Sequence, residues 1–358
     1  MIHSLEKYVE KLGMTRAGND FIDGPEVFIQ VVRKSKAYSL SPVLGSKYKY
    51  AQGSIRITSP EYNVYIKNGS VLGPQGWLLD KNGGFFEELT HSDRKGHRGG
   101  NSLYLRRRFP ELEQLSGSFI TLCYPYSTNW YHWLIQSIPR LYLVKDLLNS
   151  VDGIIVPSSF YHQRLIESLK FFGVSPSKIH VLGNRHLKVD TLIVPHYFAQ
   201  SNIPSWLPHY FRESALNQCV EKKHKRLYIS RKDVKTRRCT NEADLTISLE
   251  KLGFEVLQLS AINFSEQAVL FASAEIVIGS HGAGLSNVAF CPEGSDLVEV
   301  FPSKNTHSDL FHSIACAAKM NYWRFEGESN LSSNIHSDYS VDVEKMLTIV
   351  NKILAQAT

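Results

Sequence analysis

The chain has 358 residues, of which 43% are hydrophobic and 21% are charged. This composition is ordinary for a folded globular protein and excludes the disordered and fibrous classes. Single hydrophobic cores rarely grow beyond about 250–300 residues, so the length predicts two domains. The formal net charge of +6 suits an anionic ligand or an anionic membrane surface. The basic residues form no stripe of the kind that nucleic-acid-binding domains carry, so we expect no nucleic-acid partner.

The five cysteines are widely spaced and form no C-x-x-C pair. We therefore expect neither a disulfide framework nor a structural zinc site, and a reducing compartment fits this pattern. The N-terminal segment carries charges throughout and lacks the apolar stretch of a signal peptide. No apolar run approaches the roughly 18–20 residues that span a bilayer. These features predict a cytoplasmic protein, with the inner membrane as a candidate peripheral contact.

The N-terminal third is expected to be rich in β-structure. Residues 1–20 have the apolar spacing of a short amphipathic helix, but from about 25 to 110 short apolar runs alternate with turn signals. The turn signals are Asn68-Gly69, Gly73-Pro74 and Asn82-Gly83-Gly84. No cluster of candidate catalytic residues stands out there, so this region predicts a β-rich scaffold or an elaboration on the acceptor side.

From about residue 116 the pattern changes to alternating strands and helices. The expected strands are 119–122, 153–157, 178–182 and 192–195, and the expected helices are 130–149 and 159–172. Buried apolar strands that alternate with helices are typical of a parallel sheet covered on both faces.

A second α/β series follows an irregular connection over 196–211. Its expected strands are 226–230, 254–257, 275–279 and 297–300, and its expected helices are 211–222, 241–252, 264–273, a short one after a glycine-rich loop, 307–319 and 341–355. We predict an acceptor-side domain over 1–205 and a nucleotide-binding domain over 206–358. Two doubly wound, Rossmann-type domains of this kind face a cleft at the carboxyl ends of their strands, where ligands bind.

The most informative segment leads from an expected buried strand into His281-Gly282-Ala283-Gly284 and a helix. Glycines permit positive φ and place no Cβ between backbone N–H groups and a ligand, while the first N–H groups of a helix attract anions. The segment thus predicts a diphosphate-binding turn. In this hypothesis His281 donates to a phosphate oxygen and Ser286 or Asn287 contacts the nucleotide. The alternative is a tight turn whose glycines serve packing and whose histidine is satisfied in the core.

A basic cluster follows the first strand of the second series and should emerge at the same sheet edge. Its members are Ser230, Arg231, Lys232, Asp233, Arg237, Arg238, Asn241 and Glu242. The planar fork of arginine makes two parallel, charge-assisted hydrogen bonds to a diphosphate and would stabilise charge on a leaving group. The alternative is a solvated basic loop in which Asn241 only caps the next helix.

A third cluster lies at the start of an expected helix in the first domain. His132 and Gln136 fall one turn apart on the same face. A neutral imidazole that faces a cleft is a candidate general base for an acceptor hydroxyl, and the alternative is a histidine satisfied in the core. The aromatic side chains of Trp130, Tyr131 and Trp133 either stack on a sugar or belong to the core, and core packing is our expectation for Trp133.

These three clusters, in this order, resemble glycosyltransferase family 61, which includes plant and other eukaryotic enzymes and bacterial capsule and surface-polysaccharide proteins. The similarity is densest over Asn129–Leu141 and Arg226–Pro302. Its separate elements in the second half are Leu227–Lys232, Arg238, Asn241–Glu242, Gly253–Glu255, Phe264–Gln267, Ala274, Gly279–Asn287 and Val298–Pro302. A short glycine-rich string alone would be weak evidence, but so many spaced elements make the resemblance specific.

The resemblance implies a GT-B architecture and a transfer with inversion at the anomeric carbon, without an essential metal or other cofactor. The donor would be a nucleotide sugar, with UDP as the first candidate carrier, and the acceptor a polysaccharide or glycolipid that receives a hexosyl or pentosyl group. Carried over onto this chain, Arg231 and Arg238 neutralise the leaving diphosphate, and they form the predicted catalytic set with His132. The predicted donor-binding residues are Ser280, His281, Gly282, Ala283, Gly284, Asn287 and, at the ribose, Glu299.

One position departs from the family pattern. Many family members carry Asp or Glu where Gln136 stands, and a glutamine cannot take a proton at neutral pH. His132 is therefore our candidate base. A second hypothesis, a nucleotide-sugar-binding protein of surface-polysaccharide assembly with impaired chemistry, stays open. A hydrolase is disfavoured because no G-x-S-x-G motif surrounds Ser280 or Ser286.

Overall fold

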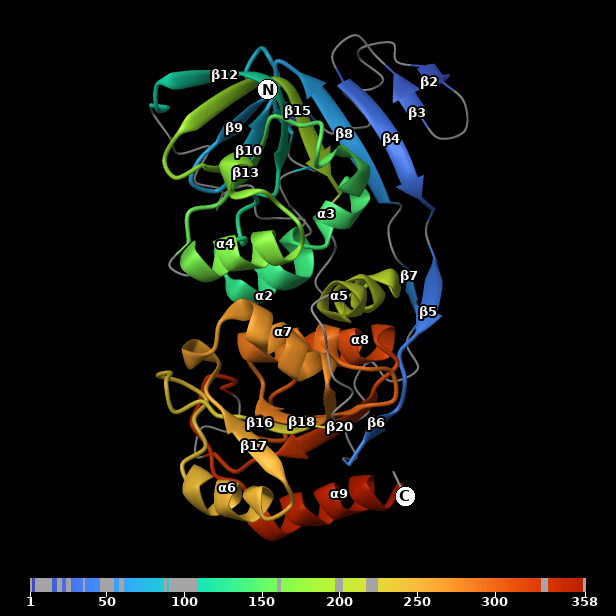
Figure 1. Cartoon of the computed structure of the whole chain (residues 1–358), viewed down its shortest axis with the longest axis vertical. Coiled ribbons are helices and arrows are strands. Elements are labelled where there is room, and N and C mark those ends of the chain that lie inside the picture. The colour runs from blue at the N-terminus through green and yellow to red at the C-terminus, as the bar shows by residue number, and fades with distance from the viewer. Residues whose placement is uncertain are drawn as a thin grey trace. The chain divides into compact units, whose positions relative to one another are not determined.

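The computed structural model describes residues 2–3, 15–17, 21–23, 27–34, 36–45, 55–57, 61–86, 89, 108–159, 162–196, 202–216, 225–329 and 334–356. The chain forms two compact units (Figure 1). Unit 1 consists of Met1–Lys36 and Ser59–Ala199, and unit 2 of Ala37–Thr58 and Gln200–Thr358. The sequence predicted a division into 1–205 and 206–358. It did not predict that the N-terminal segment 37–58 belongs to unit 2.

Unit 1 is built around one mixed sheet, twelve-stranded in the part that the structure describes. Its strands are β1 (Ile2–His3), β2 (Thr15–Ala17), β3 (Phe21–Asp23), β4 (Val27–Arg33), β8 (Glu61–Lys67), β9 (Ser70–Leu72), β10 (Trp77–Leu79), β11 (Phe85–Phe86), β12 (Leu112–Thr121), β13 (Gly153–Val156), β14 (Ile179–Val181) and β15 (His186–Pro195). Strands β15, β12, β13 and β14 pair in parallel, whereas β15 pairs antiparallel with β8 and β9. The sequence predicted a β-rich region followed by a separate doubly wound sheet. The structure instead has one continuous sheet, in which β15 joins the antiparallel strands to the parallel ones.

The expected long helix over 130–149 is broken into short pieces. They are α2 (Trp130–His132), the π-helix η3 (Trp133–Ser137), α3 (Arg140–Leu143) and the 3₁₀ helix η4 (Lys145–Leu147). Pro139 has no N–H, and its ring clashes with the carbonyl four residues earlier, so a regular α-helix cannot pass through it. The Ile138 N–H instead reaches the Trp133 carbonyl at 2.9 Å, the wider spacing of a π-turn. Helix α4 (His162–Phe171) and the 3₁₀ helix η5 (Pro176–Lys178) complete the unit's helices among the described residues.

Unit 2 contains a six-stranded parallel sheet. Its strands are β6 (Val43–Leu44), β16 (Lys225–Ile229), β17 (Phe254–Leu257), β18 (Ala274–Ser280), β19 (Asp296–Phe301) and β20 (Asn321–Glu326). Their order is β17-β16-β18-β19-β20-β6, which, counted from β16, is the 2-1-3-4-5 order of doubly wound sheets with β6 added at the edge. The sequence did not predict β20 or the contribution of β6. Segment 37–58 also carries β5 (Ala37–Ser39) and β7 (Ile55–Ile57), which pair with each other.

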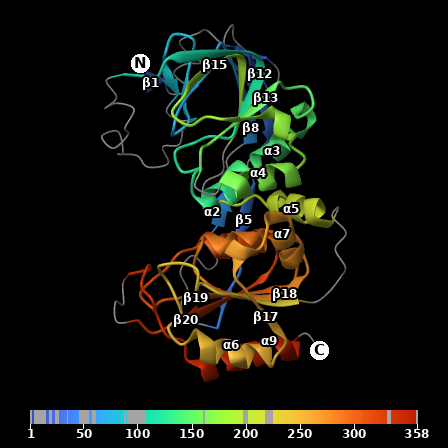
Figure 2. The ribbon, with the colours of Figure 1, turned by 60° about the vertical axis from the view of Figure 1, so that its left-hand side comes forward.

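Helices cover both faces of this sheet (Figures 1 and 2). One face carries α6 (Glu242–Glu250) and α9 (Val343–Gln356), and the other carries α5 (Trp206–Leu216), α7 (Phe264–Ala272), the 3₁₀ helix η7 (Ala283–Phe290) and α8 (Leu310–Ala317). A short 3₁₀ helix, η6 (Leu259–Ala261), precedes α7. Val298, Val300 and Trp323 pack in the core cluster under α6 and α9. Because side chains alternate along a strand, Glu299 and Tyr322 face the opposite side, towards α8.

Several other expectations meet the structure here. The amphipathic helix expected over 1–20 lies largely outside the described residues, and the described parts of that stretch, 2–3 and 15–17, are strands. None of the helices described is both long and apolar enough to cross a membrane. Four described cysteines, Cys123, Cys239, Cys291 and Cys316, are free thiols.

Candidate active site

The candidate donor site lies where the strand order of unit 2 reverses. Strand β17 follows β16 on one side, and β18 lies on the other. Open α/β sheets bind ligands at this switch point, just beyond the carboxyl ends of the strands. The basic cluster leaves β16 at Ser230, and the glycine loop leaves β18 at Ser280, so both predicted segments emerge at the switch point.

The glycines of the loop allow close approach rather than unusual backbone angles. Gly282 has φ 171° and ψ 161°, which is extended backbone that any residue adopts. A Cβ at Gly282 would lie 2.4 Å from Nη1 of Arg231, and one at Gly279 would lie 2.9 Å from Leu285. The expectation that these glycines supply positive φ is therefore wrong. Gly282 leaves room for the Arg231 guanidinium, which lies directly against its backbone, and Gly279 leaves room for Leu285.

The two arginines assigned to the diphosphate do not lie together. Arg231 donates to the Thr236 carbonyl at 3.3 Å from Nε and 3.1 Å from Nη2, which curls the loop around its guanidinium. Arg238 is half exposed and forms a bidentate pair with Asp338, at 3.0 Å from Nε and 2.7 Å from Nη2. The ion pair lowers the pKa of Asp338, with the Arg238 hydrogen bonds as the main cause. A role of Arg238 at the phosphate is not supported, because its guanidinium already holds a carboxylate.

A buried glutamate fixes the start of the basic loop. Glu242 is 4% exposed, and its carboxylate accepts hydrogen bonds from Tyr228 and Ser230, both at 3.0 Å. It also accepts a longer bond from the Arg231 N–H at 3.4 Å. Sequence reasoning gave Glu242 no role, although an acidic residue directly after an expected N-cap was the available signal.

The loop is also fastened to a segment a hundred residues later. The Arg238 N–H donates to Asp338 at 2.8 Å, and the Tyr339 N–H donates to the Arg238 carbonyl at 3.0 Å. The Asn241 side-chain amide donates to the Val341 carbonyl at 2.8 Å, and its oxygen accepts from the Val341 N–H at 2.9 Å. Asn241 makes no side-chain cap of α6, so the interpretation of this residue as only a helix cap is wrong.

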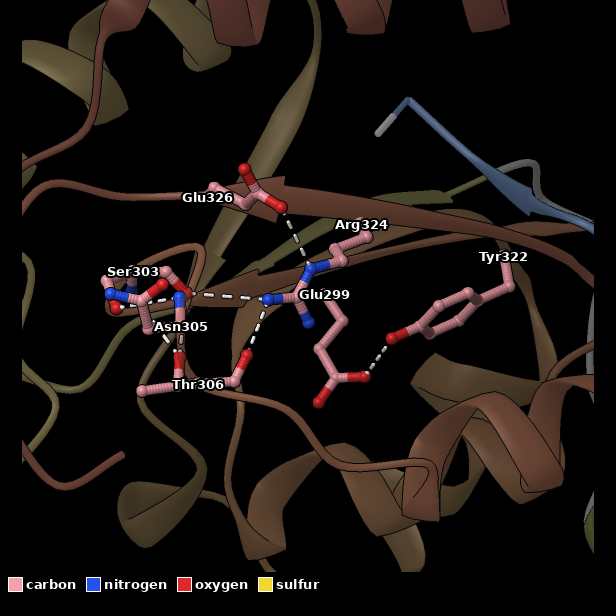
Figure 3. Close-up of polar contacts among 7 residues, drawn as sticks. All are labelled: Glu299, Ser303, Asn305, Thr306, Tyr322, Arg324 and Glu326. Carbon is pink, nitrogen blue, oxygen red and sulfur yellow. Dashed lines mark hydrogen bonds and ion pairs between the residues drawn. The ribbon is translucent and has the colours of Figure 1, made fainter. Parts of the chain in front are cut away.

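His281 belongs to a buried polar chain. Its Nδ1 lies 2.5 Å from Oε1 of Glu299, and the Tyr322 hydroxyl donates to the other carboxylate oxygen at 2.6 Å (Figure 3). Glu299 is completely buried and both of its oxygens are occupied, so it cannot contact a ribose as we expected. Its role is to hold His281. With Nδ1–H committed to the carboxylate, Nε2 is the ring nitrogen left for a ligand.

Aromatic rings and a buried arginine hold His281 in place. Its imidazole stacks on Phe301 with a centroid distance of 5.3 Å and an interplanar angle of 20°. The Arg324 guanidinium lies over the same phenyl ring at 3.9 Å and donates to the Thr306 and Ser303 carbonyls at 2.5 and 3.4 Å (Figure 3). Arg324 is 1% exposed, so it ties the loop after β19 to the sheet beneath the candidate site.

The remaining predicted donor contacts differ in accessibility. Asn287 and Ser286 are completely buried, and the Asn287 amide donates to Gln267 at 2.8 Å, so neither presents its side chain to a nucleotide. Ser280 is 8% exposed and its hydroxyl bonds to the Tyr339 hydroxyl. Ala283 and Gly284 are partly exposed. They begin η7, and the first N–H groups of a helix have no partner within it.

The candidate base of unit 1 lies at a break in a helix. The Asn129 side chain caps α2 through the Tyr131 N–H at 3.0 Å, which places His132 just before the π-helix. Nδ1 of His132 bonds to Oε1 of Gln136, and the Tyr124 hydroxyl donates to the same oxygen at 2.8 Å. An oxygen that accepts from Nδ1–H fixes the tautomer in which Nε2 carries the basic lone pair of the ring. Gln136, 1% exposed, thus orients the imidazole.

The exposed aromatic side chain beside His132 is that of Tyr126. Trp130, Tyr131 and Trp133 are 8%, 4% and 1% exposed, so the core interpretation holds for all three. Tyr126 is 40% exposed, and its ring lies 5.4 Å from that of His132. An exposed tyrosine beside the candidate base has the geometry to stack on a sugar ring. Sequence reasoning overlooked it, although it lies six residues before His132 in the same segment.

Comparison with known proteins finds one family that resembles the middle of the chain. Residues 130–298 match the model of the family described as Glycosyltransferase 61. This part of the chain, residues 130–298, is therefore similar to glycosyltransferase family 61. The matched range contains His132, the basic loop and the His281–Gly284 loop, and it ends one residue before Glu299.

Two curated relatives from Oryza sativa subsp. japonica resemble part of the chain. Alpha-1,3-arabinosyltransferase XAT2 is 29% identical over 124 residues, and alpha-1,3-arabinosyltransferase XAT3 is 28% identical over 123 residues. Each match covers 32% of this chain and 21% of the relative. The chain therefore aligns with about a fifth of the length of these relatives.

Proposed function

We propose that this protein is an inverting glycosyltransferase, which moves a sugar from a nucleoside diphosphate donor, with UDP as the first candidate carrier, to a hydroxyl of a polysaccharide or glycolipid. One observation carries the proposal. At the switch point of a doubly wound sheet, the Arg231 guanidinium lies against Gly282 of the loop that also holds the Glu299-bound His281. The match of residues 130–298 to the glycosyltransferase 61 family supports the same activity.

The donor side has the groups that a departing diphosphate needs. As the bond between the anomeric carbon and the phosphate oxygen breaks, its electron pair stays on the diphosphate. Arg231 and the first N–H groups of η7 would stabilise this negative charge. His281 would donate from Nε2 to a phosphate oxygen, and the Glu299 carboxylate would stabilise the imidazolium from the Nδ1 side.

The acceptor side needs a base, and His132 is the candidate. Its Nε2 would take the proton of the acceptor hydroxyl while that oxygen forms the new bond to the anomeric carbon. The Gln136 oxygen fixes the proton on Nδ1 and thereby keeps Nε2 basic. The departure from the acidic residue of other family members is then compatible with catalysis, because position 136 serves orientation.

The transferred sugar is proposed only as a class, hexosyl or pentosyl. The two relatives are named as arabinosyltransferases, which makes an arabinosyl donor a necessary member of any donor panel. Among the described residues no group of three His, Cys, Asp or Glu side chains is placed to hold a metal ion. On the ground of the resemblance to glycosyltransferase family 61, we propose that transfer proceeds without an added divalent cation, and activity in excess EDTA tests this.

The decisive experiment measures release of the nucleoside diphosphate from UDP-hexoses and UDP-pentoses, with and without oligosaccharide or glycolipid acceptors. Wild-type protein should release UDP only when an acceptor is present. His132→Ala should lose release while keeping UDP affinity within about threefold, whereas Tyr131→Phe serves as a matched control on the same short helix. Full release by His132→Ala would remove His132 as the base.

A second candidate function is a nucleotide-sugar-binding protein without transfer, and Gln136 is the observation that favours it. Both functions require binding of a nucleoside diphosphate at the His281–Gly284 loop. Binding without acceptor-dependent UDP release across the panel would support the second function.

A further inference from the structure

Arg237, next to Arg238, lies beside the candidate donor site. Its backbone has φ 58°, the left-handed region that non-glycine residues seldom occupy. The Ser280 hydroxyl donates to the Arg237 carbonyl at 3.3 Å, so the residue is held against the carboxyl end of β18. Arg238, whose own backbone is bonded to Asp338 and Tyr339, directs its side chain to Asp338 instead.

Arg237 lies in a partly buried position close to a second positive charge, that of Arg231. Its side chain is half-buried, and its buried Nε has no hydrogen-bond partner among the described residues. Burial, and then the positive charge of Arg231, lower the pKa of Arg237 to about 10. Two neighbouring guanidinium groups in a partly desolvated position repel each other, and a bound anion would remove that repulsion.

Three carboxylates in this part of unit 2 already hold other residues. Asp338 pairs with Arg238, and Glu299 accepts from His281 and Tyr322. Glu242 holds Tyr228 and Ser230. The positive site at Arg231 and Arg237 therefore has the chemistry of a receptor for a doubly charged group such as a diphosphate.

We propose that Arg237, in place of Arg238, is the second guanidinium that binds the donor diphosphate, and that Arg238 is a positioning residue which acts through Asp338. The proposal rests on the proposed function, since it names a residue of the same donor site. The Arg238–Asp338 pair and the adjacent bonds to residues 339–341 hold the backbone that sets the left-handed turn at Arg237.

The test compares UDP with UMP, which lacks the second phosphate, by isothermal titration calorimetry. Arg237→Ala should weaken UDP binding by about 10- to 100-fold, the scale of lost charge-assisted hydrogen bonds, and UMP binding by less than about threefold. Arg237→Lys should recover part of the loss. Lys235→Ala is the matched control, because it removes one exposed positive charge from the same loop and should change UDP affinity by less than about twofold.

Arg238 is tested through its partner. If Arg238 acts through Asp338, then Arg238→Ala and Asp338→Asn weaken UDP binding equally, and the double variant is no weaker than either. If Arg238 itself bound phosphate, Asp338→Asn would release it and strengthen UDP binding. That result, or equal UDP affinity of Arg237→Ala and Lys235→Ala, overturns the inference but leaves the proposed function standing. Absence of UDP binding by folded wild-type protein would overturn both.

Discussion

The contact between Gly282 and Arg231 gives the sharpest prediction. Gly282→Ala would place a Cβ 2.4 Å from Nη1 of Arg231, whereas nonbonded carbon and nitrogen atoms approach to about 3.5 Å. The guanidinium must therefore move by about 1 Å or more. The backbone need not, since φ 171° is open to alanine. We expect the free energy of unfolding to change by less than about 1 kcal/mol, because only the end of a flexible side chain is displaced.

Binding should suffer much more than stability. If Arg231 makes charge-assisted bonds to the diphosphate, its displacement costs about 1.5–3 kcal/mol, or roughly 10- to 150-fold in UDP affinity. Calorimetric titration of UDP into Gly282→Ala measures the loss, and urea denaturation checks the fold.

A double-mutant cycle identifies the cause. In an Arg231→Ala background the added methyl group meets no guanidinium, so Gly282→Ala should cost less than about 0.5 kcal/mol of UDP binding there. Equal losses with and without Arg231 would mean that the methyl group blocks the ligand directly, and the argument from the glycine–arginine contact would be refuted.

Three further perturbations follow from buried groups. Tyr322→Phe leaves a buried Glu299 oxygen without its donor and should lower the free energy of unfolding by about 1–3 kcal/mol in urea denaturation; an unchanged value would contradict the network. Burial lowers the pKa of His196 to about 4. The imidazole of His196 is therefore protonated near pH 6.5 in the unfolded chain but only near pH 4 in the folded protein. The free energy of unfolding should fall by about 2–3 kcal/mol as the pH drops from 6.5 to 4, and it should fall less in His196→Phe. Gln136→Glu would place a carboxylate beside Nδ1 and raise the pKa of His132, moving the acid limb of the pH–rate profile to higher pH by about one unit or more; an unmoved limb would separate His132 from the chemistry.

Local patterns predicted where the basic loop and the glycine loop lie, because the relevant signals are local. Strands β16 and β18 are apolar runs that end in polar or glycine-rich segments, and the carboxyl ends of parallel strands share one sheet edge. The break of the helix after His132 was also readable, since Pro139 is incompatible with an α-helix that continues through it. Periodicity outweighed that signal when one long helix was assigned.

Other features depend on contacts that no local window contains. The side-chain direction of Arg238 is set by Asp338, and its backbone is held by Asp338 and Tyr339, about a hundred residues later. The placement of β6 in unit 2 depends on its pairing with β20, in which Val43 lies beside Tyr322. Strand β20 itself had a readable signal, because Trp323 and Phe325 alternate with Tyr322 and Arg324, the period of a strand. Arg324 is the residue of this segment that does not fit a buried strand, since arginines are seldom fully buried.

The polar face of β19 and β20 connects the stability of unit 2 with its proposed chemistry. Glu299 and Arg324 are adjacent in the sheet register and almost fully buried, an arrangement that costs folding free energy unless every polar atom is bonded. Apolar side chains of similar volume would fold as well or better, as replacement of buried charges in other proteins has shown. They would leave Nδ1 of His281 without an acceptor and the 303–306 carbonyls without Arg324. The buried charges therefore hold His281 in one orientation at a cost in stability. We expect that an apolar replacement of Glu299 which raises the melting temperature also weakens UDP binding.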